Sequence, residues 1–427
     1  MTAPPTPGLS ARARVALTAT RALNAVSRRV GIGSGTVIGG RAGLAIDPGL
    51  LGRLAAGRTV ALVSGTNGKT TTTRLLAVAL EVSAGAGSVI TNSTGSNMPP
   101  GHVAALAGGG SDGPVVLEVD EGYLPASVTT LHPRVVVLLN LSRDQLDRTN
   151  EVRMLAGRWR GALAGAMDTT VVANADDPLV VFGAGSAARV VWVAAGMRWR
   201  ADAVGCPACE GRIVFGADGA WSCSCGFSRP APDVWITEPG EGDGEAEWTD
   251  GRHHRVALSI PGRFNRANAV MAAVAAEALG IPADRALGAM ATVDEVAGRF
   301  TTPVIAGVPT RLMLAKNPAG WAELLALVCP GDSPVVVAIN ARVADGRDPS
   351  WLWDVPFEDL RGRPVVATGE RCLDLSVRLR YAEVEHQTVR DSVAAVGVAG
   401  EEWPSDAGRP VEFIGNYTAF HDVLTHR

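Results

Sequence analysis

The stretch that most constrains the fold is residues 65–71, a glycine-rich turn with the sequence GTNGKTT. It follows the apolar run 59–63 and precedes a helix-like segment that begins at Thr72. This order is typical of a phosphate-binding loop, because the backbone N–H groups of the loop and the N-terminus of the helix together attract anions. We therefore expect an α/β fold that binds a nucleotide.

Each residue type in this turn suits a triphosphate and its metal ion. The glycines let backbone N–H groups approach phosphate oxygens closely. Lys69 can reach the terminal phosphates, and the hydroxyl of Thr70 can hold Mg²⁺, with Thr71 as a second candidate. The alternative is a glycine turn with a surface lysine, but position, spacing and flanks all favour the phosphate-binding loop. The predicted nucleotide-binding residues of the turn are Gly65, Thr66, Asn67, Gly68, Lys69, Thr70 and Thr71.

Strand-like and helix-like segments alternate from residue 59 onward, which is typical of a mostly parallel α/β sheet. Functional loops are then expected at the carboxyl ends of the strands. The strand candidates of this first part are 59–64, 88–91, 114–119, 134–141 and 169–174.

The pattern changes near residue 200 and resumes later. Residues 236–254 are acidic and turn-rich, which indicates an exposed hairpin or loop, and a strong helix is expected over 262–280. A boundary is predicted near 298–303, followed by a second α/β domain. Its strand candidates are 311–315, 334–339, 364–367 and 411–414. The expected organisation is a helical segment over 1–55, an ATP-binding domain over 56–300 and a C-terminal domain over 301–427.

Four of the six cysteines cluster as two short pairs, C-x-x-C and C-x-C, inside the segment 203–230. Two thiolate pairs separated by a hairpin-length spacer can surround one ion tetrahedrally, as Zn²⁺ requires. Four thiolates leave no open coordination position, so the predicted zinc is structural. A redox dithiol is the alternative. The predicted zinc ligands are Cys206, Cys209, Cys223 and Cys225.

Composition excludes several classes of protein. The net charge of −4 and the lack of a basic stripe argue against nucleic acid as a partner. The first 46 residues hold several arginines and no acidic side chain. Such a segment can mimic a transit peptide or lie on an anionic membrane, and the interpretation preferred here is an ordinary helix packed on the first domain. The cysteine usage indicates a reducing, cytoplasmic setting.

Five motifs in order resemble the ATP-dependent Mur ligases: GTNGKTT, LEVDEG, NLSRDQLDR, NADDP and GRFNRANA. The cysteine cluster and the segments LAKNPAGW (314–321) and INARVADGRDPSWLWDVPFE (339–358) are similar to the synthetase subunits of lipid II isoglutaminyl synthase, a branch of that family. The resemblance implies a Mur ligase-type central domain with a parallel-rich sheet, a zinc-ribbon insertion and a Rossmann-like C-terminal domain.

The resemblance also implies an activity. Members of this branch amidate the D-glutamate α-carboxylate of lipid II through an acyl phosphate, using ATP, Mg²⁺ and ammonia from a GatD-type glutaminase subunit. It implies a heterodimer that works in the cytoplasm, with peripheral contact to the inner membrane face. No glutaminase nucleophile is evident, since neither Cys329 nor Cys372 has a strand–nucleophile–helix context.

The motifs carry family roles onto particular residues. Glu118 matches the Mg²⁺-binding glutamate and is a predicted catalytic residue. Gln145 stands where many members have a metal-binding histidine, and Arg299 matches an arginine that reaches phosphate. Asn268 is the better match to the nucleotide-recognising asparagine; for Asn265 helix capping is the alternative. Asn174, Asp176 and Asp177 resemble the element near the base.

The acceptor side and the partner side are predicted in the same way. Asn97 lies in a loop expected to border the acceptor, and Lys316 and Asn317 occupy the turn where acceptor and ATP meet in related ligases. Asp348 is implied to reach the glutaminase and complete its Cys–His–Asp arrangement, with Asp345 and Asp354 as competitors. Trp351 and Trp353 suit an interface anchor or core packing equally.

Two other functions are open alternatives. A Mur or folylpolyglutamate-type ligase would use an amino acid in place of ammonia and would need no partner. A nucleic-acid-dependent ATPase would use the cysteine ribbon as its reader, which the acidic net charge opposes.

Overall fold

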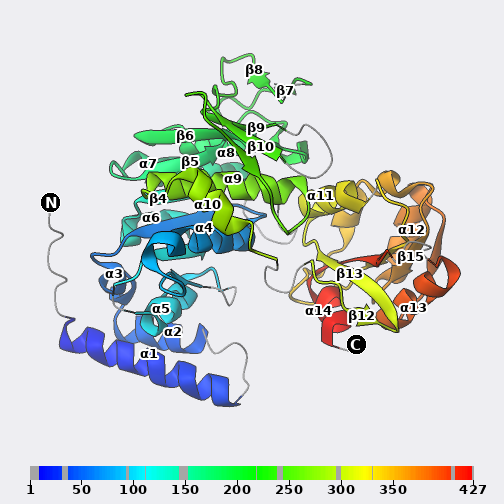
Figure 1. The fold of residues 1–427 in the computed structure, drawn as a ribbon, viewed down its shortest axis with the longest axis horizontal. Coiled ribbons are helices and arrows are strands. Elements are labelled where there is room, and N and C mark those ends of the chain that lie inside the picture. Colours follow the sequence, from blue (N-terminus) through cyan, green and yellow to red (C-terminus); the bar gives the residue numbers. More distant parts are fainter. Residues whose placement is uncertain are drawn as a thin grey trace.

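The computed structural model describes residues 9–30, 37–92, 96–110, 112–143, 152–217, 219–237, 244–294, 300–328, 330–404 and 409–425. Two sheets, each with its own core, lie side by side along the long axis of the molecule (Figure 1). No helix in these ranges combines the length and the apolar character needed to cross a membrane.

The larger sheet has the order β11-β10-β9-β6-β5-β4-β1-β3-β2. Its strands from β9 to β2 run parallel, while β10 and β11 add an antiparallel edge. The strands are β1 (Val60–Ser64), β2 (Ile90–Thr91), β3 (Val115–Val119), β4 (Val135–Leu138), β5 (Thr170–Asn174), β6 (Arg189–Ala194), β9 (Val234–Thr237), β10 (Gly244–Trp248) and β11 (His253–Val256).

Helices cover both faces of this sheet, so its central strands read as continuous apolar runs. Alternate β1 residues enter opposite cores: Ala61 and Val63 pack with α4, α9 and α10, whereas Val60 and Leu62 face the other layer. The helices of this half are α1 (Ala11–Val30), α2 (Val37–Ile46), α3 (Leu50–Ala55), α4 (Lys69–Ala84), α5 (Pro99–Gly108), α6 (Leu124–Leu131), α7 (Val152–Ala164), α8 (Pro178–Ala184), α9 (Arg263–Ala278) and α10 (Ala283–Met290).

The smaller sheet has the order β12-β13-β17-β14-β15-β16 and is parallel except for β12. Its strands are β12 (Val304–Ile305), β13 (Val308–Leu314), β14 (Val335–Ala338), β15 (Val365–Thr368), β16 (His386–Thr388) and β17 (Val411–Gly415). Around it lie α11 (Pro318–Val328), α12 (Cys372–Tyr381), α13 (Ser392–Glu402), α14 (Tyr417–Thr425) and the 3₁₀ turns η2 (Ser350–Asp354) and η3 (Phe357–Leu360).

The α/β class and the strands expected from the pattern are confirmed, and so is the long helix, which is α9. The acidic segment expected as a hairpin or loop contributes β10 and β11 to the sheet edge. The cysteine segment forms a separate hairpin, β7 (Ile213–Phe215) and β8 (Trp221–Cys223), which projects from the larger half (Figure 1).

Candidate active site

The glycine-rich turn connects β1 to α4 at the carboxyl edge of the larger sheet. Gly68 has φ +87° and precedes the first helical residue, and a Cβ there would lie 2.7 Å from Oδ1 of Asn268. Gly65 has φ +143°, and a Cβ on it would press on the backbone of Asn140. Both positions therefore need glycine, for the positive φ and for close packing.

Two pairs of interacting side chains, an ion pair and a hydrogen bond, lie at this turn. The Lys69 ammonium lies 3.1 Å from the Glu121 carboxylate and donates to the carbonyl oxygens of Gly65 and Thr66. The hydroxyl of Thr70 donates to Oε2 of Glu118 at 2.8 Å. A hydroxyl and a carboxylate side by side next to a phosphate-binding loop are the oxygen ligands that Mg²⁺ prefers.

The backbone of Glu118 is held from two sides. Asn92 accepts from its N–H and donates to its carbonyl, both at 2.8 Å. Nε2 of the fully buried His102 donates to the same carbonyl at 2.9 Å, which fixes the tautomer. Burial lowers the pKa of His102 to about 4, against the smaller opposing effect of that hydrogen bond. Asn92 and His102 thus position Glu118 through its backbone.

The lowered pKa of His102 predicts how the stability of the protein depends on pH. Its folded pKa lies below its ordinary value of 6.5, so the unfolded chain takes up a proton first as the pH falls. Stability from this residue is present above pH 6.5 and is lost between pH 6.5 and about 4, by about 3 kcal/mol. We expect His102→Gln, which keeps an N–H donor, to lose less stability than the wild type over that range in urea unfolding.

The stability of the variant must be compared with that of the wild type at each pH, because the titration of Asp177 changes stability in the opposite direction. Burial raises the pKa of Asp177 to about 6, so its ionisation opposes folding as the pH rises toward 7. The exposed His253 provides the control variant His253→Gln. A stability difference between His102→Gln and wild type that stays constant from pH 7 to pH 4 would contradict the prediction.

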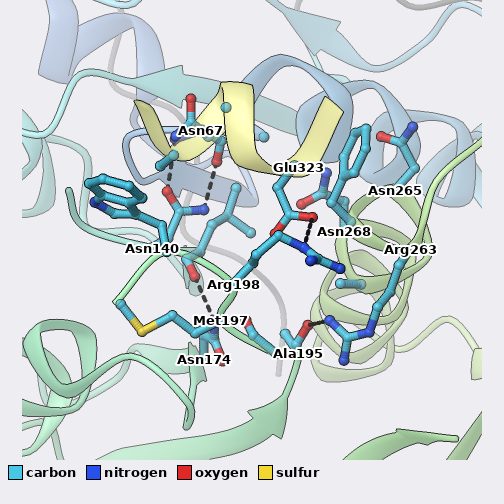
Figure 2. Close-up of a pocket in the computed structure, with 18 of the residues that line it drawn as sticks. Asn67, Asn140, Asn174, Ala195, Met197, Arg198, Arg263, Asn265, Asn268 and Glu323 are labelled. Atoms are coloured by element: carbon cyan, nitrogen blue, oxygen red, sulfur yellow. Dashed lines mark hydrogen bonds and ion pairs between the residues drawn. The ribbon is translucent and has the colours of Figure 1, made fainter. Parts of the chain in front are cut away.

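A pocket continues from the phosphate-binding turn between the larger sheet and α11 (Figure 2). Its walls combine apolar side chains, among them Leu139, Met197 and Phe264, with amides and a few charges. Concave, mostly apolar sites with a few placed polar groups are typical of ligand sites. The polar residues lining it are Asn67, Thr71, Asn140, Ser142, Asn174, Asp177, Arg198, Arg263, Asn265, Asn268 and Glu323.

Contacts between the two halves of the chain close this pocket. Asn67 exchanges hydrogen bonds with the side chain of Asn317, which also caps α11 by accepting from Gly320 N–H. Asn140 holds the backbone of Asn67 by two further bonds. Arg198 and Glu323 of α11 pair at 3.7 Å (Figure 2). The phosphate-binding turn is therefore coupled directly to the smaller sheet.

The three residues after β5 have different roles. Asn174 donates to the carbonyls of Leu139 and Gly196, and so joins the ends of three strands. Asp176 pairs with Arg229 at 2.6 Å and accepts from Gly196 N–H. Asp177 accepts hydrogen bonds from the N–H groups of Leu141, Leu179 and Val180, and it caps the N-terminus of α8. Asn174 and Asp177 line the pocket, whereas Asp176 ties it to the cysteine hairpin.

The remaining predicted residues fall in different places. Asn268 lines the pocket beside Gly68, and Asn265 donates to the Pro261 carbonyl, leaving its buried Oδ1 without a partner among the described residues. Asn97 is half-buried, and its carbonyl accepts from Asp120 N–H near Glu118. Lys316 is exposed, with its ammonium 5.5 Å from the Tyr417 ring centre. Gln145 and Arg299 lie outside the described residues.

The four predicted cysteine ligands meet in one cluster. Their sulfur atoms lie within 4.8 Å of one another, with Cys206–Cys225 at 3.8 Å and Cys209–Cys223 at 3.5 Å. Metal–sulfur bonds of about 2.3 Å in a tetrahedron put sulfur atoms about 3.8 Å apart. The cluster thus fits a tetrahedral metal ion.

The three aspartates considered for the predicted contact with a partner subunit have different surroundings. Asp345 is buried and accepts from Thr418 N–H and Oγ1, so it serves the fold. Asp354 lies 3.4 Å from Arg143. Asp348 is exposed, and its hydrogen bond from Ser350 N–H lowers its carboxyl pKa. Trp351 is buried against Trp321, whereas Trp353 is 54% exposed.

Sequence reasoning gave no role to Asn140, Arg198, Arg263 and Glu323. Asn140 and Arg263 lie inside motifs that carry the resemblance, so their positions were a usable signal. Arg198 and Glu323 are brought together from opposite halves of the chain, and no local pattern marks them.

Two family models match the chain and together cover more than half of it. Residues 63–199 match the Mur ligase middle domain, and residues 314–420 match the MurT ligase C-terminal domain. The chain is 29% identical over 390 residues to the lipid II isoglutaminyl synthase (glutamine-hydrolyzing) subunit MurT of Staphylococcus aureus, covering 86% of each. It is also 29% identical to the same-named subunit of Streptococcus pneumoniae, covering 82% of this chain and 83% of that one.

Solved structures agree on the fold. A pseudomurein peptide ligase type C from Methanothermus fervidus superposes with a TM-score of 0.63 at 20% identity, over 86% of this chain and 78% of that one. MurF from Acinetobacter baumannii gives 0.64 at 15% identity, over 90% and 80%.

Proposed function

Because the chain belongs to the Mur ligase family, we propose that it is the synthetase subunit of a glutamine-hydrolysing carbon–nitrogen ligase. It amidates the D-glutamate α-carboxylate of lipid II to D-isoglutamine during peptidoglycan synthesis. The observation that carries the proposal is the match to the two MurT subunits, which spans more than four-fifths of both chains.

The site chemistry supports such a ligase. A carboxylate and the γ-phosphate of ATP repel each other, so cations must hold them together. Lys69 and the N-terminus of α4 supply positive potential, and Thr70 with Glu118 would hold Mg²⁺, which neutralises phosphate charge when bound. The substrate carboxylate attacks the γ-phosphorus and ADP leaves. Ammonia then attacks the acyl carbon and the bond to the phosphate oxygen breaks. Ammonia gives up one proton, which leaves with the phosphate, and the amide remains.

The pocket beside the turn is assigned to the rest of the nucleotide. Asn268 borders the phosphate-binding turn. The buried Oδ1 of Asn265, which has no hydrogen-bond partner in the part of the chain that the structure describes, suits an amino-group donor such as the adenine N6. The Asn67–Asn317 pair places the α11 N-terminus next to the turn, so that both halves of the chain contribute to ATP binding. Gln145 and Arg299 remain phosphate-side candidates, and Asn97 and Lys316 remain acceptor-side candidates.

The ammonia source is proposed to be a GatD-type glutaminase in a heterodimer. The relatives are named as subunits. Leu373, Val377 and Tyr381 recur every fourth residue along α12, are 63%, 48% and 73% exposed, and share one helix face. Tyr381 packs edge-on against Trp353, whose turn η2 begins two residues after Asp348. This exposed apolar surface close in the chain to the exposed Asp348 carboxylate suits a docked subunit that receives Asp348.

Asp348→Asn should separate the two half-reactions. Without the carboxylate, the partner's histidine loses its orienting charge, and glutamine-dependent amidation should fall by about a hundredfold to ten-thousandfold. Amidation with ammonium chloride should not change. The exposed Asp374→Asn serves as a matched control. Equal losses with glutamine and with ammonium would contradict the assigned role.

The proposed activity is tested by incubating the purified chain with lipid II, ATP and Mg²⁺. Mass spectrometry should detect replacement of OH by NH₂ with ammonium chloride, and with glutamine only when the glutaminase is added. Ligation of an added amino acid without a partner would instead favour the Mur or folylpolyglutamate-type alternative.

The cysteine cluster is assigned to structural Zn²⁺, because four thiolates leave no position for substrate.

A further inference from the structure

On the outermost helix, α1, Val15 and Val26 face solvent, although Leu17 is half-buried and packs on the core. α1 lies beneath α2 and α5 in Figure 1, at the end of the larger half opposite the β7–β8 hairpin. Val15 and Val26 of α1 are 60% and 55% exposed. A surface helix ordinarily turns its apolar side inward. The buried residues of α1 are small or polar: Ala13, Ala16, Thr20, Asn24 and Ser27.

Close packing against α2 explains the inward side. Gly39 and Gly43 of α2 are buried, and a Cβ on either would overlap the side chains of Asn24 and Thr20 respectively. The two helices therefore approach through small residues, which leaves no room for large apolar side chains between them. Val15 and Val26 lie outside this packed side and stay more than half exposed.

Further exposed residues accompany these valines on α1 and α2. Val15 and Val26 lie about three turns apart, and so on one line of the helix. Leu23 of α1 is 38% exposed, and Ile38 of α2 is 47% exposed. We call these four residues, with the exposed Arg14, Arg28, Arg29 and Arg41, the α1 face.

The charge of the α1 face has one sign. No acidic residue occurs before Asp47, and Asp47 is buried and paired with Arg53. Among the described residues, Arg14, Arg28, Arg29 and Arg41 have no carboxylate within ion-pair distance. The whole chain nevertheless has a net charge of −4, so the cationic face is a local feature. Exposed apolar groups among arginines are the combination that binds an anionic lipid surface.

We propose that the α1 face docks the protein on an anionic lipid bilayer, with α1 lying in the plane of the interface. The inference rests on the proposed function in that a lipid-linked substrate must be reached at a membrane. α5 begins directly after the Asn97 loop, and Arg21 of α1 donates to the Ala107 carbonyl near its other end. A single helix therefore links the docking face to the proposed acceptor loop.

The test is flotation of the full chain with phosphatidylcholine vesicles, with and without phosphatidylglycerol, in the absence of substrate, ATP and partner. We expect binding only to the anionic vesicles, weakened by salt. R14Q/R28Q/R29Q should lower the apparent affinity by roughly a hundredfold, and V15S/V26S by roughly tenfold. The control R158Q/R285Q/R380Q removes the same charge from exposed positions elsewhere and should bind like the wild type.

Equal binding to neutral and anionic vesicles, or equal binding by the two triple variants, would overturn the proposal. So would a dimer in sedimentation that V15S/V26S dissociates, since the face would then belong to a second copy of the chain. Thermal melting checks that each variant folds. Amidation of a short-chain lipid II analogue in detergent is measured separately, so that loss of vesicle binding and loss of the proposed activity are distinguishable.

Discussion

Lys69→Met is expected to abolish ATP-dependent amidation, with a loss of about a thousandfold or more. The ammonium sits in the phosphate-binding turn, between two of its own carbonyls and the Glu121 carboxylate. When ATP binds, this charge is free to move to the phosphates and offset the negative charge that builds up during transfer. Methionine keeps an unbranched side chain of similar length and removes the ammonium group with its charge and its hydrogen-bond donors. The measurement is ADP release together with product mass.

The variant has a side effect that must be controlled. It removes the ion pair between Lys69 and the largely buried Glu121, which lowers stability. The double variant Lys69→Met/Glu121→Gln removes both charges and should recover thermal stability without recovering activity. Arg74→Met removes an exposed cation from the same helix and should leave activity intact. Activity of Lys69→Met within tenfold of the wild type would refute the phosphate role.

Cys223→Ser is expected to remove the metal and unfold the β7–β8 hairpin. Structural zinc sites in small domains contribute about 10 kcal/mol to folding, because the site does not exist in the unfolded chain. Without the ion, the small cluster of Ile213, Trp221 and Phe227 cannot hold the hairpin by itself. Elemental analysis should fall from about one zinc per chain to none, and limited proteolysis should cut within 205–226.

The loss should also reach the nucleotide pocket. Trp221 donates to the Ala175 carbonyl, and Arg229 pairs with Asp176, so the hairpin supports the loop that holds Asn174 and Asp177. We expect nucleotide affinity to fall about tenfold, because the loop that holds Asn174 and Asp177 loses this support. Cys372→Ser is the matched control, because Cys372 is buried but lies in α12 outside the cluster. Full zinc content in Cys223→Ser would disprove the assigned ligand set.

Local patterns predicted most of the elements. The run of β1, the glycine turn and the start of α4 are neighbours in sequence, and each agrees with the others in propensity and spacing. The cysteine pairs likewise needed only a hairpin to meet. By contrast, the sequence of 236–254 did not predict that this segment extends the larger sheet. Its strand β10 pairs with β9, and the position of β9 in the sheet depends in turn on its pairing with β6.

Side-chain roles were harder to predict than elements. Glu118 was marked by its motif, but the two residues that hold its backbone, Asn92 and His102, come from a loop and a helix with no shared pattern. Three aspartates in one short segment looked equivalent, until burial of Asp345 and pairing of Asp354 left Asp348 exposed. Burial and pairing are properties of packed surfaces, so residue spacing could not distinguish them.

The sequence by itself determined the phosphate-binding turn, the parallel α/β class and the four-cysteine cluster, because each depends on residues close together in the chain. Only the tertiary structure decided how the two halves share one pocket. Asn67 meets Asn317, and Arg198 meets Glu323, across more than a hundred intervening residues. It also decided that Val15 and Val26 of α1 face outward, because the glycines of α2 admit only small side chains between the two helices. Long-range packing selects such contacts, and no local periodicity encodes them.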